Sequence, residues 1–225
     1  MNRMGVFDIL GPIMIGPSSS HTAGAARLGK IARSIAGDDI LEVTFLLHGS
    51  FAKTYKGHGT DRALVAGILG MEPSDDRLRN SIDIAVEKGI KFLFKEADLG
   101  DVHPNTVKFV MRTIKDKYCE VTGSSIGGGN IKIIEVNDNE VDFTGMYETL
   151  IVAHKDAPGC INSVTSLLYS ENINVAFMRV FRQHKGEDAM MICEMDNKLS
   201  DELIEKIKKI ELVNNVISIS PARIS

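Results

Sequence analysis

The C-terminal part of the chain has an order of segments that few folds accommodate. Six segments stand apart by composition and periodicity: Glu148–His154, Gly159–Ser170, Asn174–Gln183, Asp188–Met195, Ser200–Ile210 and Val213–Ile219. The first, third, fourth and sixth are short runs rich in large apolar residues, which is typical of strands, whereas the second and fifth have helical spacing. The predicted order is therefore strand, helix, strand, strand, helix, strand.

Local signals support this order. Lys185-Gly186-Glu187 has the composition of a tight hairpin between the two middle strands. Ser200 is a favourable N-cap for a helix with Leu203 and Ile207 on one face. The order predicts a ferredoxin-like βαββαβ domain over residues 147–225.

Residues 1–146 predict a separate domain of different make-up. Helical composition marks residues 22–35, 62–71 and 77–88, and strand composition marks residues 40–48, 90–96, 107–114, 118–125 and 130–136. We interpret Gly127-Gly128-Gly129 as a hairpin turn, because a phosphate-binding loop would be followed by a helix. Since the strands cluster late, the sequence favours an α+β fold with a mixed N-terminal domain.

Composition narrows the classes of partner. The formal net charge of −4 and the lack of a long basic run argue against nucleic acid. Cys119, Cys160 and Cys193 are far apart, which argues against a disulfide scaffold and against a metal site held by this chain alone. No apolar run reaches membrane-spanning length, so we expect a soluble cytoplasmic protein with no membrane partner.

The stretch Gly16–Gly29, GPSSSHTAGAARLG, gathers hydroxyls and an imidazole before a helix. Ser18, Ser19 and Ser20 are N-cap formers, and the helix is expected to begin at Thr22. A helix start exposes backbone N–H groups that bind a carboxylate or phosphate. The stretch therefore predicts either an anion-binding turn or a simple serine-rich cap.

A second polar stretch follows the first predicted strand. We expect a turn at Gly49-Ser50 and a polar loop at Gly57-His58-Gly59-Thr60-Asp61, with Thr60 or Asp61 as the cap of the next helix. His58 lies between two glycines and either contributes to a site or only shapes the turn. Of the other histidines, His48 is expected to be structural.

Two motifs give the chain a family resemblance. GPSSSHTAGAARLG at 16–29 and GSFAKTYKGHGTDRALVAGILGM at 49–71, followed by the βαββαβ segment, resemble the beta chain of the bacterial iron–sulfur L-serine dehydratase. The first domain also resembles the allosteric substrate-binding domain of some D-3-phosphoglycerate dehydrogenases. The last domain resembles the ACT domain, a regulatory module that binds small ligands.

The resemblance implies a function, a cofactor and a partner. The chain would be the beta subunit of an ammonia-lyase that converts L-serine to pyruvate and ammonia, would be inactive alone, and would serve amino-acid metabolism and gluconeogenesis. An alpha chain would hold the four-iron four-sulfur cluster, and a monovalent cation is a further candidate cofactor. Two ACT domains are expected to pair through exposed strand edges.

The resemblance also assigns candidate residues. His21 and His58 are the candidates for proton transfer, since histidine titrates near neutrality. The candidates for binding serine are Ser18, Ser19, Ser20, Thr22, Thr60 and Asp61, and those for a regulatory amino acid are Asp156, Ala157, Pro158, Gly159 and Asn162.

Two alternatives stay open. The same Pro-Gly turn starts a helix without any ligand. The whole chain could also be a purely regulatory amino-acid-binding module with no residue in the chemistry. A regulatory fragment of a phosphoglycerate dehydrogenase is disfavoured, because the sequence lacks a dinucleotide-binding fingerprint.

Overall fold

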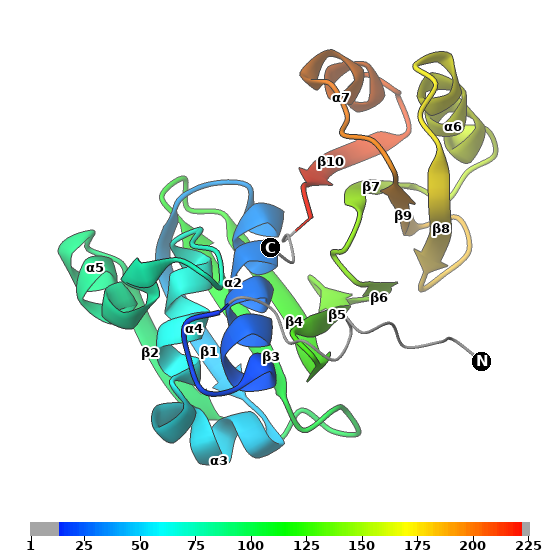
Figure 1. The fold of residues 1–225 in the computed structure, drawn as a ribbon. Helices are drawn as coiled ribbons and strands as arrows, with labels where there is room; N and C mark the ends of the chain where they lie inside the picture. The colour runs from blue at the N-terminus through cyan, green and yellow to red at the C-terminus, as the bar shows by residue number, and fades with distance from the viewer. Residues whose placement is uncertain (1–13, 222–225) are drawn as a thin grey trace, which may run out of the picture. The chain divides into compact units, whose positions relative to one another are not determined.

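The computed structural model describes residues 14–221, which form two compact units that divide between Asn137 and Asp138 (Figure 1). The first unit is a mixed sheet with helices, and the second is a four-stranded antiparallel sheet with two helices. The predicted α+β class is confirmed. Each unit is described separately below.

The sheet of the first unit has the strand order β2-β1-β3-β4-β5. Its strands are β1 (Ile40–Leu47), β2 (Lys91–Glu96), β3 (Thr106–Thr113), β4 (Tyr118–Gly127) and β5 (Asn130–Val136). β1 pairs in parallel with β2, and the other neighbours are antiparallel. All five strands were predicted, as was the glycine hairpin between β4 and β5.

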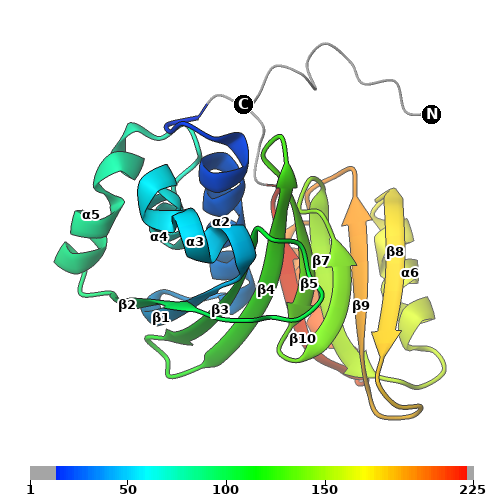
Figure 2. The ribbon, with the colours of Figure 1, turned by 90° about the horizontal axis from the view of Figure 1, so that it is seen from below.

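The helices of this unit lie on one face of the sheet (Figure 2). They are the π-helix η1 (Ser19–Gly24), α2 (Ala25–Ala36), α3 (Gly49–His58), α4 (Thr60–Ile68), the 3-10 helix η2 (Asp76–Asn80) and α5 (Ser81–Glu87). The three predicted helices are confirmed, although the third is divided between η2 and α5.

The turn and loop predicted between residues 49 and 59 were wrong, because Gly49–His58 is helix α3. Glycines lie at both ends of this helix, and its apolar content is low, so its sequence is similar to that of a loop. Phe51 and Ala52 are buried and attach the helix to the core. Gly59, with φ of +71°, ends α3 and is also the residue that precedes α4.

Helices α2 and α4 pack with their backbones in close contact. A Cβ atom on Gly67 would lie 2.2 Å from the carbonyl oxygen of Ala26, and one on Gly29 would lie 2.6 Å from that of Leu64. Farther along, Arg33 Nη1 donates to the carbonyl of Ile68 at 3.0 Å. Gly29 is thus in contact with Gly67, and Arg33, one turn farther along α2, contacts Ile68 and Gly70 at the end of α4. The two helices therefore run in the same direction and begin at the same end (Figure 1).

The second unit begins with a short strand, β6 (Asn139–Phe143), which the sequence did not predict because three of its five residues are polar. The other elements are β7 (Glu148–Lys155), α6 (Cys160–Ser170), β8 (Val175–Arg182), β9 (Asp188–Met195), α7 (Asp201–Lys208) and β10 (Val213–Ile219). The sheet order β10-β7-β9-β8 is the ferredoxin-like arrangement, so this prediction is confirmed.

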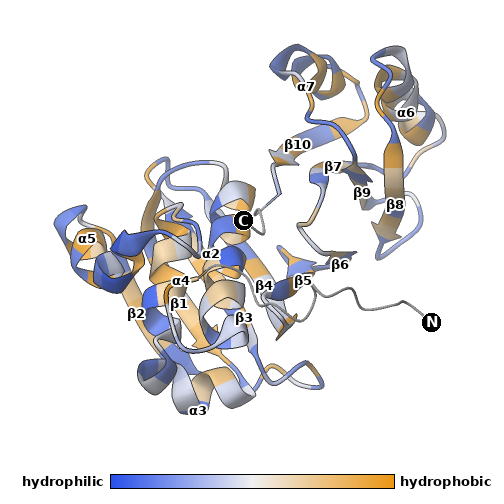
Figure 3. Cartoon of the chain, viewed as in Figure 1, coloured by the Kyte–Doolittle hydropathy of each residue, from blue (hydrophilic) through white to orange (hydrophobic). Residues whose placement is uncertain are grey.

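Two features of this unit bear on function. Its core joins the buried faces of β7 and β9 to α6 and α7, through residues such as Leu150, Val164 and Leu203. The edge strand β8 is apolar along most of its length (Figure 3), and Phe177, Met178 and Val180 are exposed on it. An exposed apolar edge strand is a template for pairing with another chain.

The close contact of α2 and α4 can be tested by Gly67→Ala. The added methyl group would overlap the backbone of α2, so we expect the free energy of unfolding to fall by about 2–3 kcal/mol. Gly57→Ala is the control, because a Cβ there meets nothing within 4 Å. Denaturant unfolding of both variants gives the result, and equal stability would contradict the packing described.

Candidate active site

Ser18 begins η1 as its N-cap, as predicted for this serine-rich stretch. The backbone N–H of His21 donates to Ser18 Oγ at 3.3 Å, and that of Thr22 donates to the Ser18 carbonyl at 2.8 Å. Ser19 and Ser20 follow in the first turn and are half-buried. The capping hydrogen bond therefore fixes the backbone position of His21 in the first turn of η1.

Both ring nitrogens of His21 lie near a hydroxyl. Nδ1 is 3.4 Å from Ser18 Oγ, and Nε2 is 3.2 Å from Ser50 Oγ at the start of α3. The ring also meets the edge of Phe51, with the centroids 5.4 Å apart. Burial lowers the pKa of His21 below its ordinary value of 6.5, and the neighbouring His58 lowers it further. The ring is therefore neutral at neutral pH.

His58 is the last residue of α3, and the structure brings it to His21. The two ring centroids are 4.8 Å apart, with the planes inclined by 33°. His58 is exposed and lines a cavity of about 360 Å³, together with Thr22, Lys56, Arg62 and Arg79. The parallel packing of α2 and α4 produces this meeting, because η1 and the end of α3 lie at the shared starting end of those helices.

The predicted capping by Thr60 or Asp61 was wrong. Gly59 precedes α4, which has no side-chain cap, so Thr60 is already helical and fully buried. Asp61 Oδ1 accepts the adjacent N–H of Arg62, at 2.8 Å. The hydroxyls of Thr22 and Thr60 are both buried without a hydrogen-bond partner among the described residues. Buried hydroxyls without partners are uncommon in proteins, and such groups often bind a ligand or an ordered water.

Sequence reasoning missed Ser50, because it treated Gly49-Ser50 as a turn. Its Oγ reaches His21, and its backbone N–H donates to the Pro104 carbonyl at 2.8 Å. A serine directly after a buried strand and three residues before a lysine carries no signal of this role. The contact depends on α3 folding back over η1.

Other histidines lie outside this group. His48 Nδ1 accepts the backbone N–H of Leu99 at 3.1 Å, as expected for a structural residue. His103 Nδ1 accepts the N–H of Asn105 at 3.1 Å, and His103 is exposed in its loop. Neither contacts the pair formed by His21 and His58.

An iron–sulfur cluster does not fit the part of this chain that is described. Residues 14–221 contain no group of three or more histidine, cysteine or acidic side chains that could hold a metal ion. The three cysteines are buried, and burial raises the pKa of Cys119 and of Cys193 to about 11. These thiols are protonated at neutral pH and do not resemble cluster ligands.

The predicted regulatory loop contacts the hairpin between β8 and β9. Asp156 Oδ2 accepts from the Gly186 N–H at 2.9 Å and from Arg182 Nη1 at 2.8 Å, and these bonds lower the pKa of Asp156. Gly159, with φ of +95°, precedes α6. Ala157 and Pro158 lie between them, and Asn162 is exposed in the first turn. Asp156 is thus held by its own domain, and ligand binding at this loop stays a prediction.

None of the helices in the described part of the chain is both long and apolar enough to cross a membrane.

The electrostatics of the histidine pair predict how His21 titrates. We expect its pKa, measured by NMR, to lie below 6.5, so that protonation below that pH favours the unfolded chain and stability falls as pH falls. His58→Gln should raise the pKa of His21 only partly, because burial is the larger cause. His103→Gln is the control. A His21 pKa above 6.5 would contradict the geometry.

Comparison with known proteins agrees with the predicted family. The family model described as serine dehydratase beta chain matches residues 5–87, and the ACT domain model matches residues 148–212. The probable L-serine dehydratase beta chain of Bacillus subtilis (strain 168) is 43% identical over 220 residues, covering 98% of this chain and 100% of that protein.

Two further relatives are similar to most of this chain, one along nearly its whole length and the other along about a third of its length. The L-serine dehydratase beta chain of Peptoniphilus asaccharolyticus is 42% identical, covering 94% of this chain and 96% of that protein. The D-3-phosphoglycerate dehydrogenase of Bacillus subtilis (strain 168) is 25% identical, covering 83% of this chain but only 35% of that protein. The chain therefore belongs to the serine dehydratase beta chain family and contains an ACT domain.

Proposed function

We propose that this chain, as the beta subunit of an L-serine dehydratase, supplies the histidine pair His21 and His58 to an active site completed by an alpha chain. The observation that carries the proposal is the ring separation of 4.8 Å between two histidines from separate sequence motifs. A neutral, partly buried imidazole beside a second one in a cavity wall suits proton transfer.

Dehydration of serine makes three demands on the site. A base removes the α-proton, the β-hydroxyl leaves as water, and a group must hold the carboxylate. The resulting enamine tautomerises, and hydrolysis yields pyruvate and ammonia. His58 faces the cavity and takes the α-proton in this proposal. His21 is held by Ser18 and Ser50, and orients the His58 ring from behind.

Substrate contacts are proposed for the hydroxyls near the pair. The hydroxyls of Thr22 and Thr60 have no hydrogen-bond partner within residues 14–221. The two helix starts also contain Ser18, Ser19, Ser20 and Asp61. A bound substrate would satisfy buried hydroxyls that otherwise cost about 1–3 kcal/mol each.

The iron–sulfur cofactor and the alpha-chain partner are proposed on the basis of the family resemblance. The four-iron four-sulfur cluster would be held by the alpha chain and would supply a Lewis acid for departure of the hydroxyl group when bound. A monovalent cation remains a candidate with no residue assigned to it. We also propose a cytoplasmic location and no binding of nucleic acid, as the charge predicts.

The ACT domain is proposed as the regulatory part. We place its start at about residue 147, after β6, which precedes it in the second compact unit. Its loop at Asp156–Gly159, with Asn162, would bind a small amino acid. Two copies would associate through β8, where Phe177, Met178 and Val180 are exposed at the sheet edge.

A purely regulatory role is the second candidate. It is favoured by the D-3-phosphoglycerate dehydrogenase relative, in which a segment similar to this chain makes up 35% of a different enzyme. In that case the histidine variants would change the response to serine and leave the maximal rate intact.

Reconstitution with the alpha chain tests the proposal. We expect oxygen-free mixtures of both chains to form pyruvate from L-serine, and His58→Gln and His21→Gln to lower kcat at least about a hundredfold. His103→Gln, in an exposed loop, should keep normal turnover. Near-normal kcat in both site variants would reject the catalytic role and favour the regulatory one.

A further inference from the structure

The cavity beside His58 is lined by positive charge. Lys56 and His58 at the end of α3, Arg62 in α4 and Arg79 in η2 all line it, with the backbone of Gly57 and Gly59. No aspartate or glutamate is among its described lining residues. Three permanent cations around one small cavity attract an anion and repel a cation.

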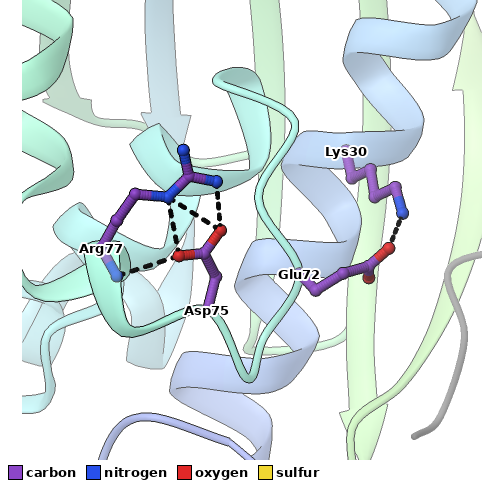
Figure 4. Close-up of polar contacts among 4 residues, drawn as sticks. All are labelled: Lys30, Glu72, Asp75 and Arg77. Carbon is purple, nitrogen blue, oxygen red and sulfur yellow. Dashed lines mark hydrogen bonds and ion pairs between the residues drawn. The ribbon is translucent and has the colours of Figure 1, made fainter.

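These cations are not neutralised by the described part of the protein. None of Lys56, Arg62 and Arg79 forms an ion pair with a residue between 14 and 221, whereas nearby basic residues do. Figure 4 shows Arg77, in the same 3-10 helix as Arg79, held by the carboxylate of Asp75, and Lys30 paired with Glu72. Arg79 lines the cavity and forms no ion pair with the described residues, whereas Arg77 is paired with Asp75 and does not line the cavity.

A buried hydroxyl supplies independent evidence for a ligand. Thr22 lines the same cavity, is 1% exposed, and its Oγ1 has no hydrogen-bond partner among the described residues. A ligand oxygen in the cavity would satisfy this hydroxyl. The volume of about 360 Å³ lies at the small end of the range for ligand pockets, which is about 300–1,000 Å³.

We propose that this cavity binds the carboxylate of a small organic acid, with Arg62 and Arg79 as its principal ionic partners. A guanidinium fork matches the two oxygens of a carboxylate, and an anion held there lies beside His58. Ser18, Ser19 and Ser20, candidates from the sequence for binding serine through its carboxylate or its hydroxyl, are not among the described residues lining the cavity. That the acid is L-serine rests on the proposed function.

A ligand titration of the full chain, followed by two-dimensional NMR of the backbone amides, tests the chemical class. L-serine and pyruvate should shift the amide signals of Gly57 and Gly59, which line the cavity. Ethanolamine, which has the amine and hydroxyl of serine but no carboxylate, should leave them in place. Equal shifts with ethanolamine, or shifts with inorganic phosphate alone, would overturn the assignment.

Charge-removing variants test the residues. Arg62→Gln and Arg79→Gln should each weaken the binding of pyruvate at least about tenfold, because a charge-assisted hydrogen bond is lost. Arg77→Gln is the matched control and should bind pyruvate normally, since Asp75 already holds that side chain. Unchanged amide signals outside the cavity establish folding. Full affinity in both cavity variants would overturn the proposal.

Pyruvate formation by the assembled subunits separates this inference from the proposed function. If the carboxylates bind as expected but the assembled chains form no pyruvate from L-serine, the proposed function fails and the carboxylate site stands. If Arg62→Gln and Arg79→Gln form pyruvate with unchanged KM and kcat, the carboxylate site fails and the proposed function stands.

Discussion

The contact between α2 and α4 at Gly29 and Gly67 determines where the site forms. The absence of a side chain at these two positions lets the backbones touch, and any Cβ at Gly67 would overlap the Ala26 carbonyl. Because the helices are parallel, the residues that precede each of them are brought to one end of the layer. Each sequence motif thus contains a glycine at the helix contact, Gly29 or Gly67, and a histidine, His21 or His58, that this contact brings to the site.

The histidine pair has electrostatic properties that follow from this placement. Two rings 4.8 Å apart disfavour double protonation, and the partial burial of His21 acts in the same direction. Ser18 and Ser50 hold the His21 ring from two sides, while His58 is exposed to the cavity. The arrangement gives one fixed imidazole and one accessible imidazole, a division of roles that suits proton transfer to a bound molecule.

The sequence predicted those parts of the fold that depend on local composition. Buried runs such as Ile40–Leu47 mark strands by themselves, and Ser18 and Ser200 mark helix starts by their capping chemistry. Helix α3 and strand β6 were missed, because a few buried side chains and tertiary contacts outweigh their weak local preference.

The candidate site was predictable only in part, for a related reason. His21 and His58 lie in polar motifs that attract notice in the sequence. Ser50, Arg62 and Arg79 have no distinctive sequence context. Only the tertiary structure shows that Ser50 contacts His21 and that Arg62 and Arg79 line the cavity beside His58. Asp156 shows the reverse, because the sequence predicted that its carboxylate would bind a ligand. In the structure that carboxylate accepts hydrogen bonds from Arg182 and Gly186, which lie far along the chain.

The central claim is that the two histidines act as one unit, and a double-mutant cycle on pyruvate formation tests it most directly. The rates of the assembled enzyme with His21→Gln, His58→Gln and both substitutions would be compared with that of the unmodified enzyme. Residues that act together lose most of their effect in the first substitution, so the double variant should be little slower than the worse single variant. Losses that multiply independently would show that the two histidines work separately and would contradict the account.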